Sequence, residues 1–246
     1  MKTLILTIVV CLLASSVNAA LIDDLVAYWS FEEESGNLID IHGDHDGTVT
    51  GSLGYETVGK IGTAITWDGT SLERFDIADH ADFTVTAFTY SVWVAADGNV
   101  DRSICQTYGS TSGDGFTIQQ ENSPEGINYK VWVSGSEVTC SSNDAISYTG
   151  WTHIVAVREA DGDMILYIDA VAQDDTETLA GEIDNASTLK IGVDWTNAKE
   201  YSGEIDEMGF WSRALSEAEI TALNNSGACL AYPFTGVSGT RVGVRK

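Results

Sequence analysis

The chain has 246 residues, and 37 acidic side chains against 12 basic ones give it a formal net charge of −25. Such an acidic chain is a poor candidate for binding nucleic acid or an anionic membrane, because Lys and Arg make the contacts to phosphate groups. It is long enough for one large β-domain with a sizeable core, and no internal repeat or Pro- or Gly-rich linker divides it. We expect one domain over residues 20–230.

The first 19 residues have the pattern of a secretory signal peptide. Lys2 supplies the positive charge, residues 4–14 are apolar, and small residues at 17–19 form a cleavage site. The apolar run is too short to cross a bilayer as a helix, although an uncleaved anchor is the alternative. We expect a secreted, extracellular protein that is not inserted in a membrane after cleavage.

Three cysteines follow the predicted signal peptide, namely Cys105, Cys140 and Cys229. Export permits disulfides, and an odd number leaves one thiol unpaired or paired between chains. We predict a Cys105–Cys140 disulfide, with Cys229 available to join two chains. The spacing leaves Cys229 open as an alternative partner within the chain.

Short runs rich in β-branched and aromatic residues fill the chain from residue 25 to residue 210, with Gly, Asp, Asn and Ser between them. In NYKVWVS, Tyr129 and Val131 alternate with Lys130 and Trp132, as in a strand with one buried face. Many short strands with regular turn signals are typical of an antiparallel β-sandwich. The fold class that we predict is therefore all-β.

One short helix is predicted near the C-terminus. Ser216 and Glu219 have the spacing of a capping box, apolar residues including Leu223 follow, and Gly227 is placed to end the helix. The last residues, 231–246, form a tail with three basic side chains, which is either disordered or a docking strand for another protein.

Several segments in a fixed order resemble one known family. They are AYWSFEEESGN, HDGTVTG, GKIGTAITWDGT, FTYSVWV, GWTHIVAV, LYIDA, LKIGV and GEIDEMGFWSRALSEAEITAL. Together they resemble a laminin G-like domain, of the pentraxin-related branch of the concanavalin A-like superfamily, over residues 25–223. The resemblance implies a two-sheet jelly roll that binds glycans or proteins, often with a structural Ca²⁺ and usually without catalysis. It departs after LYID, where Ala170 replaces the usual Gly and indicates another type of turn.

The segment EIDEMG nearly matches the E-I-D-x-x-E signature of β-glucanases. Those enzymes need two carboxyl groups on one face, about 5–5.5 Å apart in retaining enzymes. Strand alternation places Met208, which cannot transfer a proton, on the face of Glu204 and turns Glu207 to the other face. We therefore expect no hydrolysis at this segment. The same alternation places Asp206 beside Met208 on the core side, where a carboxylate needs a partner.

The resemblance implies a Ca²⁺ site as that partner. Its ligands would include Asp40, Asp68 and Asp206, because Ca²⁺ prefers oxygen ligands such as carboxylates and takes about six to eight of them. The alternative is that Asp206 only accepts hydrogen bonds from backbone amides. A second cluster, the loop IHGDHDG with His42 and His45, is a weak zinc signal, and we expect an ordinary solvated loop there.

Aromatic residues in loops are the candidates for ligand contact. Trp195, in the loop GVDWTNAKEYSG, is the first, Tyr108 in another Gly- and Ser-rich loop is the second, and Trp132 is expected to be half-exposed. The other tryptophans are assigned to packing. The sequence predicts a secreted, non-catalytic, lectin-like carbohydrate-binding module for an extracellular glycan. The alternative is an adhesive or structural protein that binds cell-surface or matrix proteins, with chains joined through Cys229 or the tail; a glycoside hydrolase is less favoured.

Overall fold

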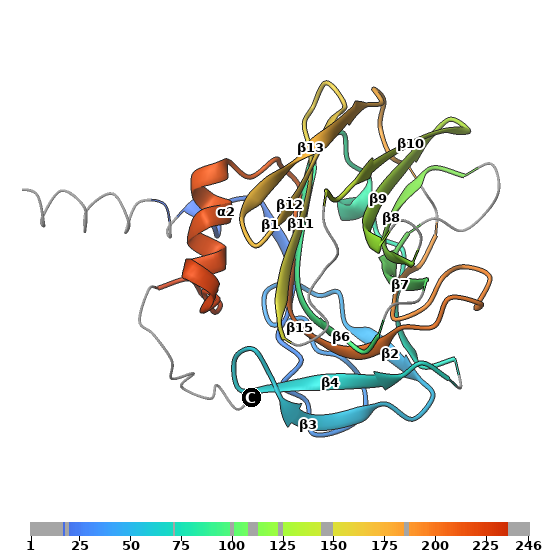
Figure 1. Cartoon of the computed structure of the whole chain (residues 1–246), viewed down its shortest axis with the longest axis vertical. Coiled ribbons are helices and arrows are strands. Elements are labelled where there is room, and N and C mark those ends of the chain that lie inside the picture. Colours follow the sequence, from blue (N-terminus) through green and yellow to red (C-terminus); the bar gives the residue numbers. More distant parts are fainter. Residues whose placement is uncertain are drawn as a thin grey trace, which may run out of the picture.

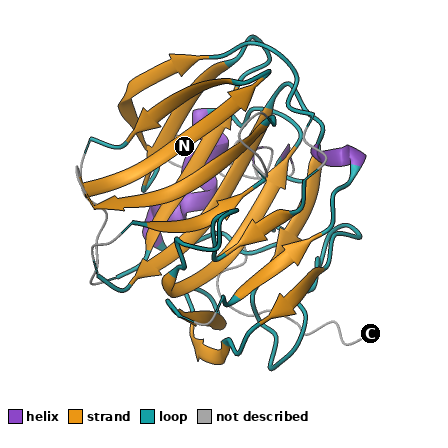
Figure 2. Ribbon diagram, turned by 90° about the vertical axis from the view of Figure 1, so that its right-hand side faces the viewer, coloured by secondary structure: helices purple, strands orange, loops and turns teal. Residues whose placement is uncertain are grey.

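Two antiparallel β-sheets face each other in the computed structural model (Figure 1, Figure 2). The structure describes residue 17 and residues 20–70, 72–98, 101–107, 113–122, 125–143, 150–184 and 187–235. Tyr108, most of the predicted signal peptide and residues 236–246 lie outside the described residues. In the described part of the chain, no helix is long and apolar enough to cross a membrane.

The first sheet has eight strands in the order β13-β12-β11-β6-β15-β4-β3, with β1 paired to β15. These strands are β1 (Leu25–Trp29), β3 (Gly54–Val58), β4 (Thr63–Asp68), β6 (Phe88–Ala96), β11 (Thr152–Arg158), β12 (Asp163–Ile168), β13 (Val171–Thr178) and β15 (Ser202–Trp211). The second sheet has seven strands in the order β10-β9-β8-β7-β14-β5-β2. They are β2 (Gly47–Thr50), β5 (Arg74–Ile77), β7 (Arg102–Gln106), β8 (Gly115–Asn122), β9 (Glu125–Val133), β10 (Ser136–Ser141) and β14 (Leu189–Ile191). The predicted all-β sandwich is confirmed.

The main core lies between the sheets and is built by the alternation visible in the sequence. In β9, Tyr129 and Val131 are buried in this core, whereas Lys130 and Trp132 face outward and are half-buried. In β11 both faces are buried, because Val155 and Val157 on its outer face belong to a second apolar cluster on the eight-stranded sheet.

That second cluster packs under helix α2 (Glu217–Asn224), which Figure 1 shows beside the eight-stranded sheet. The predicted capping box is present: Ser216 Oγ accepts from the amide of Glu219, whose carboxylate accepts from the amide of Ser216 at 2.8 Å. The helix ends earlier than predicted, because Asn225 adopts the left-handed conformation (φ 50°). Gly227 instead ends a 3₁₀ turn, η2 (Asn225–Gly227).

The turn between β12 and β13 also differs from the prediction. Asp169 and Ala170 both have positive φ, 50° and 64°, so Ala170 keeps the left-handed turn that glycine usually makes. Its methyl group packs against the second apolar cluster. Burial of this methyl offsets part of the steric cost of the conformation.

The predicted Cys105–Cys140 disulfide is wrong. Cys105, Ile118, Tyr129 and Cys140 pair in one row across β7, β8, β9 and β10. Three strand spacings separate the two cysteines by about 14 Å, whereas bridged Cα atoms lie about 4.4–6.8 Å apart. Both thiols are buried and reduced, and burial raises the pKa of Cys140 to about 11. Cys229 is only 6 % exposed, which makes a bridge to a second chain dependent on local opening.

Candidate functional site

The segment EIDEMG lies in β15 and contains a β-bulge that the sequence does not reveal. The register against β6 shifts between Asp206 and Gly209, and Glu207 has φ of 50°. The extra residue turns Met208 into the core, while Asp206 faces outward opposite Trp93. The prediction that Asp206 and Met208 share a face is therefore wrong. The Glu207 carboxylate accepts from the hydroxyl of Tyr28, a residue of the outer apolar cluster. Glu207 therefore also faces outward, and the prediction that it turns to the face opposite Glu204 is wrong.

Asp206 holds the turn between β3 and β4 against β15. Its fully buried carboxylate accepts hydrogen bonds from the amides of Ile61 (3.0 Å) and Glu207 (2.9 Å). Backbone amides satisfy a buried carboxylate without an ion. The alternative with hydrogen bonds to the backbone is the one that the geometry supports.

The predicted Ca²⁺ ligand set does not form. Asp40 accepts hydrogen bonds from the amides of Tyr28, His42, Gly43 and His45 at 2.9–3.1 Å. Asp68 is exposed and accepts from the amide and hydroxyl of the nearby Thr70, which lowers the pKa of Asp68. Among the described residues, Asp40, Asp68 and Asp206 do not come together as a group with metal-ligand spacing. Ca²⁺ binding at other ligands stays a prediction.

The loop between β14 and β15, residues 192–201, passes from one sheet to the other and presents Trp195. Its shape depends on Asp194, which accepts from the Thr196 hydroxyl (2.6 Å) and from the amides of Ala198 (2.7 Å) and Lys199 (3.1 Å). Although burial opposes ionisation, these hydrogen bonds hold the pKa of Asp194 below its ordinary value. Trp195 is 39 % exposed at the start of this loop, as predicted.

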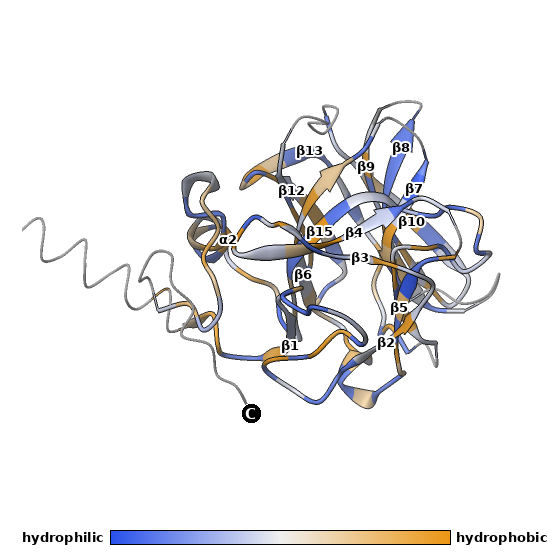
Figure 3. Cartoon of the chain, turned by 90° about the horizontal axis from the view of Figure 1, so that it is seen from below, coloured by the Kyte–Doolittle hydropathy of each residue, from blue (hydrophilic) through white to orange (hydrophobic). Residues whose placement is uncertain are grey.

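The outer face of the seven-stranded sheet is polar. The register places one row of hydrogen-bonding side chains across it, and Figure 3 shows hydrophilic segments in β7 and β8. The row contains Thr139, Lys130, Thr117, Gln106, Lys190 and Asp76. Beside it, Glu121 forms ion pairs with Lys130 (3.8 Å) and Lys199 (3.4 Å). Gln106 and Thr117 are buried, whereas Thr139, Lys130, Lys190 and Asp76 are partly exposed. The polar groups of this face that solvent reaches are therefore mainly these four.

Trp132 and Trp195 lie at opposite ends of this face. Trp132 pairs with Gly115 at the start of β8, and its Nε1 donates to Glu137 at 3.0 Å. The loop that carries Trp195 instead reaches Glu121, near the end of β8, through Lys199. The structure therefore does not bring the two tryptophans into one small site.

A hollow of about 400 Å³ lies on the eight-stranded sheet, where β4, β6 and β15 meet the residues that precede β11. Trp151, Asp97 and Glu204 are among its lining residues. Burial, and then the negative charge of Asp97, raises the pKa of Glu204. Sequence reasoning assigned Trp151 to packing, and nothing in its local sequence indicates that it borders a hollow.

The two facing antiparallel sheets and the polar outer face define a concanavalin A-like β-sandwich. The chain belongs to the family Laminin_G_3, described as the concanavalin A-like lectin/glucanases superfamily, whose model matches residues 68–221. No protein of curated function matches the sequence.

Solved structures share the fold at low sequence identity. The binding domain of Paraclostridial Mosquitocidal Protein 1 aligns at 19 % identity and TM-score 0.66, over 84 % of this chain and 53 % of that one. Domain 4 of AbnA, a GH43 extracellular arabinanase from Geobacillus stearothermophilus in complex with arabinotriose, aligns at 20 % identity and TM-score 0.66, over 80 % and 97 %. The binding domain of Botulinum Neurotoxin DC in complex with SialylT aligns at 14 % identity and TM-score 0.64, over 85 % of this chain and 52 % of that one. This chain thus spans about half of each toxin domain and resembles binding domains in its fold.

Proposed function

We propose that this protein is a secreted, non-catalytic carbohydrate-binding module with Trp195 as its main ligand contact. The observation that carries the proposal is a 39 % exposed indole on a loop that Asp194 fixes by three hydrogen bonds. A rigid aromatic side chain loses little conformational entropy when a sugar ring packs on it. The arabinotriose complex of AbnA domain 4, with the same fold, supports a saccharide as the class of ligand.

Polar side chains near the loop supply the second part of such a site. Lys190 Nζ donates to Asn197 Oδ1 at 3.4 Å, which places both groups at the border between the sheet and the loop. Lys199 and Glu121 form an ion pair on the same face. Ammonium, amide and carboxylate groups can each hydrogen-bond sugar hydroxyls, and such polar groups fix the orientation of a bound ligand.

The first test is a glycan array probed with the whole chain, followed by titration calorimetry with any glycan that binds. Trp195→Ala should weaken binding by about tenfold or more, as for a central aromatic contact. Trp132→Ala, at the other end of the same face, is the matched control and should bind like the wild type. Equal affinity of Trp195→Ala and the wild type would refute the site, and an array without binding would favour the protein-binding alternative.

The same titration in EDTA tests the Ca²⁺ prediction. Binding that EDTA abolishes and that Ca²⁺, but not Zn²⁺, restores would support a stabilising Ca²⁺. Unchanged binding in EDTA would refute it.

One observation favours a second candidate function, hydrolysis at Glu204. This half-buried carboxyl group has a raised pKa beside Trp151 and Asp97, as a general acid requires. Incubation with the bound glycan should release no new reducing ends if the module only binds. Product formation that Glu204→Gln abolishes would show that the protein is an enzyme.

A further inference from the structure

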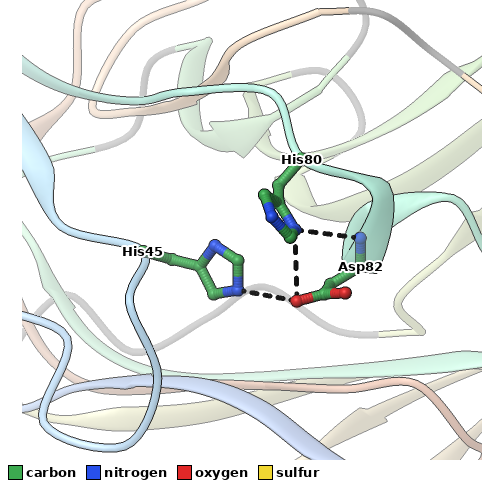
Figure 4. A group of neighbouring side chains, drawn as sticks. All are labelled: His45, His80 and Asp82. Carbon is green, nitrogen blue, oxygen red and sulfur yellow. Dashed lines mark hydrogen bonds and ion pairs between the residues drawn. The ribbon is translucent and has the colours of Figure 1, made fainter.

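Three metal-ligating side chains from two distant loops meet at one point of the surface (Figure 4). His45 belongs to the loop that follows β1, and His80 and Asp82 belong to the segment between β5 and β6, at η1 (Ala81–Phe83). His45 Nε2 lies 3.2 Å from Asp82 Oδ2, and His80 Nδ1 lies 3.1 Å from the same oxygen. One ligand atom from each of the three residues falls within 4.8 Å of the others.

These separations fit a tetrahedral zinc site. Bonds of about 2.0–2.1 Å from zinc to nitrogen or oxygen place neighbouring ligand atoms about 3.3 Å apart. Two edges of the observed triangle, 3.2 Å and 3.1 Å, are already close to that value. Two imidazole nitrogens and one carboxylate suit zinc, whereas Ca²⁺ prefers oxygen ligands alone. We propose that His45, His80 and Asp82 bind a zinc ion that links the two loops.

His45 is held ready for this role by its own backbone. Its amide donates to Asp40 Oδ2 at 3.1 Å, its carbonyl accepts from Trp29 Nε1 at 2.8 Å, and its ring lies 4.8 Å from that of Phe83. The side chain is only 8 % exposed. A ligand that the fold already orients loses little entropy when it binds a metal, so Asp40 serves the site through His45.

The other two ligands face solvent, which gives an ion a route of entry. The side chains of His80 and Asp82 are 55 % and 52 % exposed. They border a pocket of about 320 Å³ that is also lined by His42 and Asp44. The three protein ligands leave the fourth tetrahedral position open on this side for water or a small anionic ligand.

Binding has one identifiable cost. In the structure, the amide of Asp82 donates to His80 Nδ1 at 3.2 Å. This nitrogen has a single lone pair, so zinc would displace that hydrogen bond. Asp82 is half-exposed and water can take the place of the lost acceptor. The net charge of −25 favours uptake of a divalent cation.

The test uses the whole chain prepared without a histidine tag, treated with EDTA, desalted and titrated with Zn²⁺ in a calorimeter. The wild type should bind one ion per chain, and saturation at about 100 times the dissociation constant should raise Tm by about 5 °C. His80→Gln and Asp82→Asn should each weaken binding by at least about tenfold. Both changes lie on exposed side chains, and circular dichroism will show whether the fold is retained.

Asp79→Asn is the matched control, because it removes the same charge from an exposed residue three positions before Asp82. It should bind zinc like the wild type. Absence of zinc binding by the wild type would overturn the proposal and leave the three side chains as a hydrogen-bonded cluster. The proposal also fails if His80→Gln and Asp82→Asn bind normally, or if Asp79→Asn weakens binding as much as they do. None of these outcomes depends on glycan binding.

Discussion

The outer faces of the two sheets have opposite characters. On the eight-stranded sheet, outward side chains such as Tyr28, Val157 and Trp211 are mainly apolar, and they pack in one cluster with α2 and with residues 230–234 that follow it. On the seven-stranded sheet, the outward row contains Lys130, Thr117 and other polar side chains. The first face is used for packing, because burying it on the helix removes apolar area from water. The second face carries no such cover among the described residues.

Substitution of one tryptophan on each face tests this difference most strongly. Trp211 is fully buried and its Nε1 donates to the carbonyl of Leu21 at 2.8 Å. Trp211→Ala should lower the free energy of unfolding by about 3–5 kcal/mol. Trp132→Ala, on the half-buried polar face, should lower it by about 1 kcal/mol or less. Urea denaturation of both variants measures the contrast, and similar losses would show that the two faces do not differ as described.

The pH dependence of stability should report a buried histidine on the apolar side. His153 stacks on Trp93 with ring centroids 4.7 Å apart, and burial, then the charge of Lys60, lowers its pKa to about 3. The unfolded chain binds a proton near pH 6.5, so this contribution to stability is complete above pH 6.5 and is lost progressively as the pH falls toward 3. Urea midpoints from pH 7.5 to 4 should fall less steeply in His153→Gln than in the wild type. Parallel curves would contradict the low pKa.

The smallest effects should appear in two hairpin turns, one in each sheet. Ala170 (φ 64°) packs on the apolar cluster, whereas Ser134 (φ 50°) is exposed in the turn between β9 and β10. Glycine relieves the strain at both positions and costs chain entropy at both, but only Ala170→Gly also loses a packed methyl group, worth about 0.8 kcal/mol. Ser134→Gly should therefore be the more stable variant by about that amount in urea denaturation. A reversed order would show that burial of the methyl does not compensate the strain.

Features that depend only on residues close together in the chain could be predicted from the sequence. Alternation in β9 predicted its buried and outward faces, and the spacing of Ser216 and Glu219 predicted the helix start. The bulge at Glu207 was not predictable, because it appears only in the register against β6.

The candidate site was predictable only in part, for the same reason. Exposure of Trp195 followed from its polar loop. The pairing of Cys105 and Cys140 failed because strand order, and not sequence spacing, sets their separation. His45 and His80 are 35 positions apart, and only the fold places them beside Asp82. Contacts of this kind can be predicted only after the order of the strands in each sheet is known.

The position of β15 has a consequence for how the protein is made. This strand, the last one in the described part of the chain, pairs with β1, β4 and β6 in the middle of the eight-stranded sheet. A nascent chain that ends before residue 202 lacks the strand that joins the early part of the sheet to the late part. Non-local pairing of this kind is slow to form. We expect the polypeptide to stay unfolded until nearly all of it has been synthesised, which is the state that a translocation channel accepts.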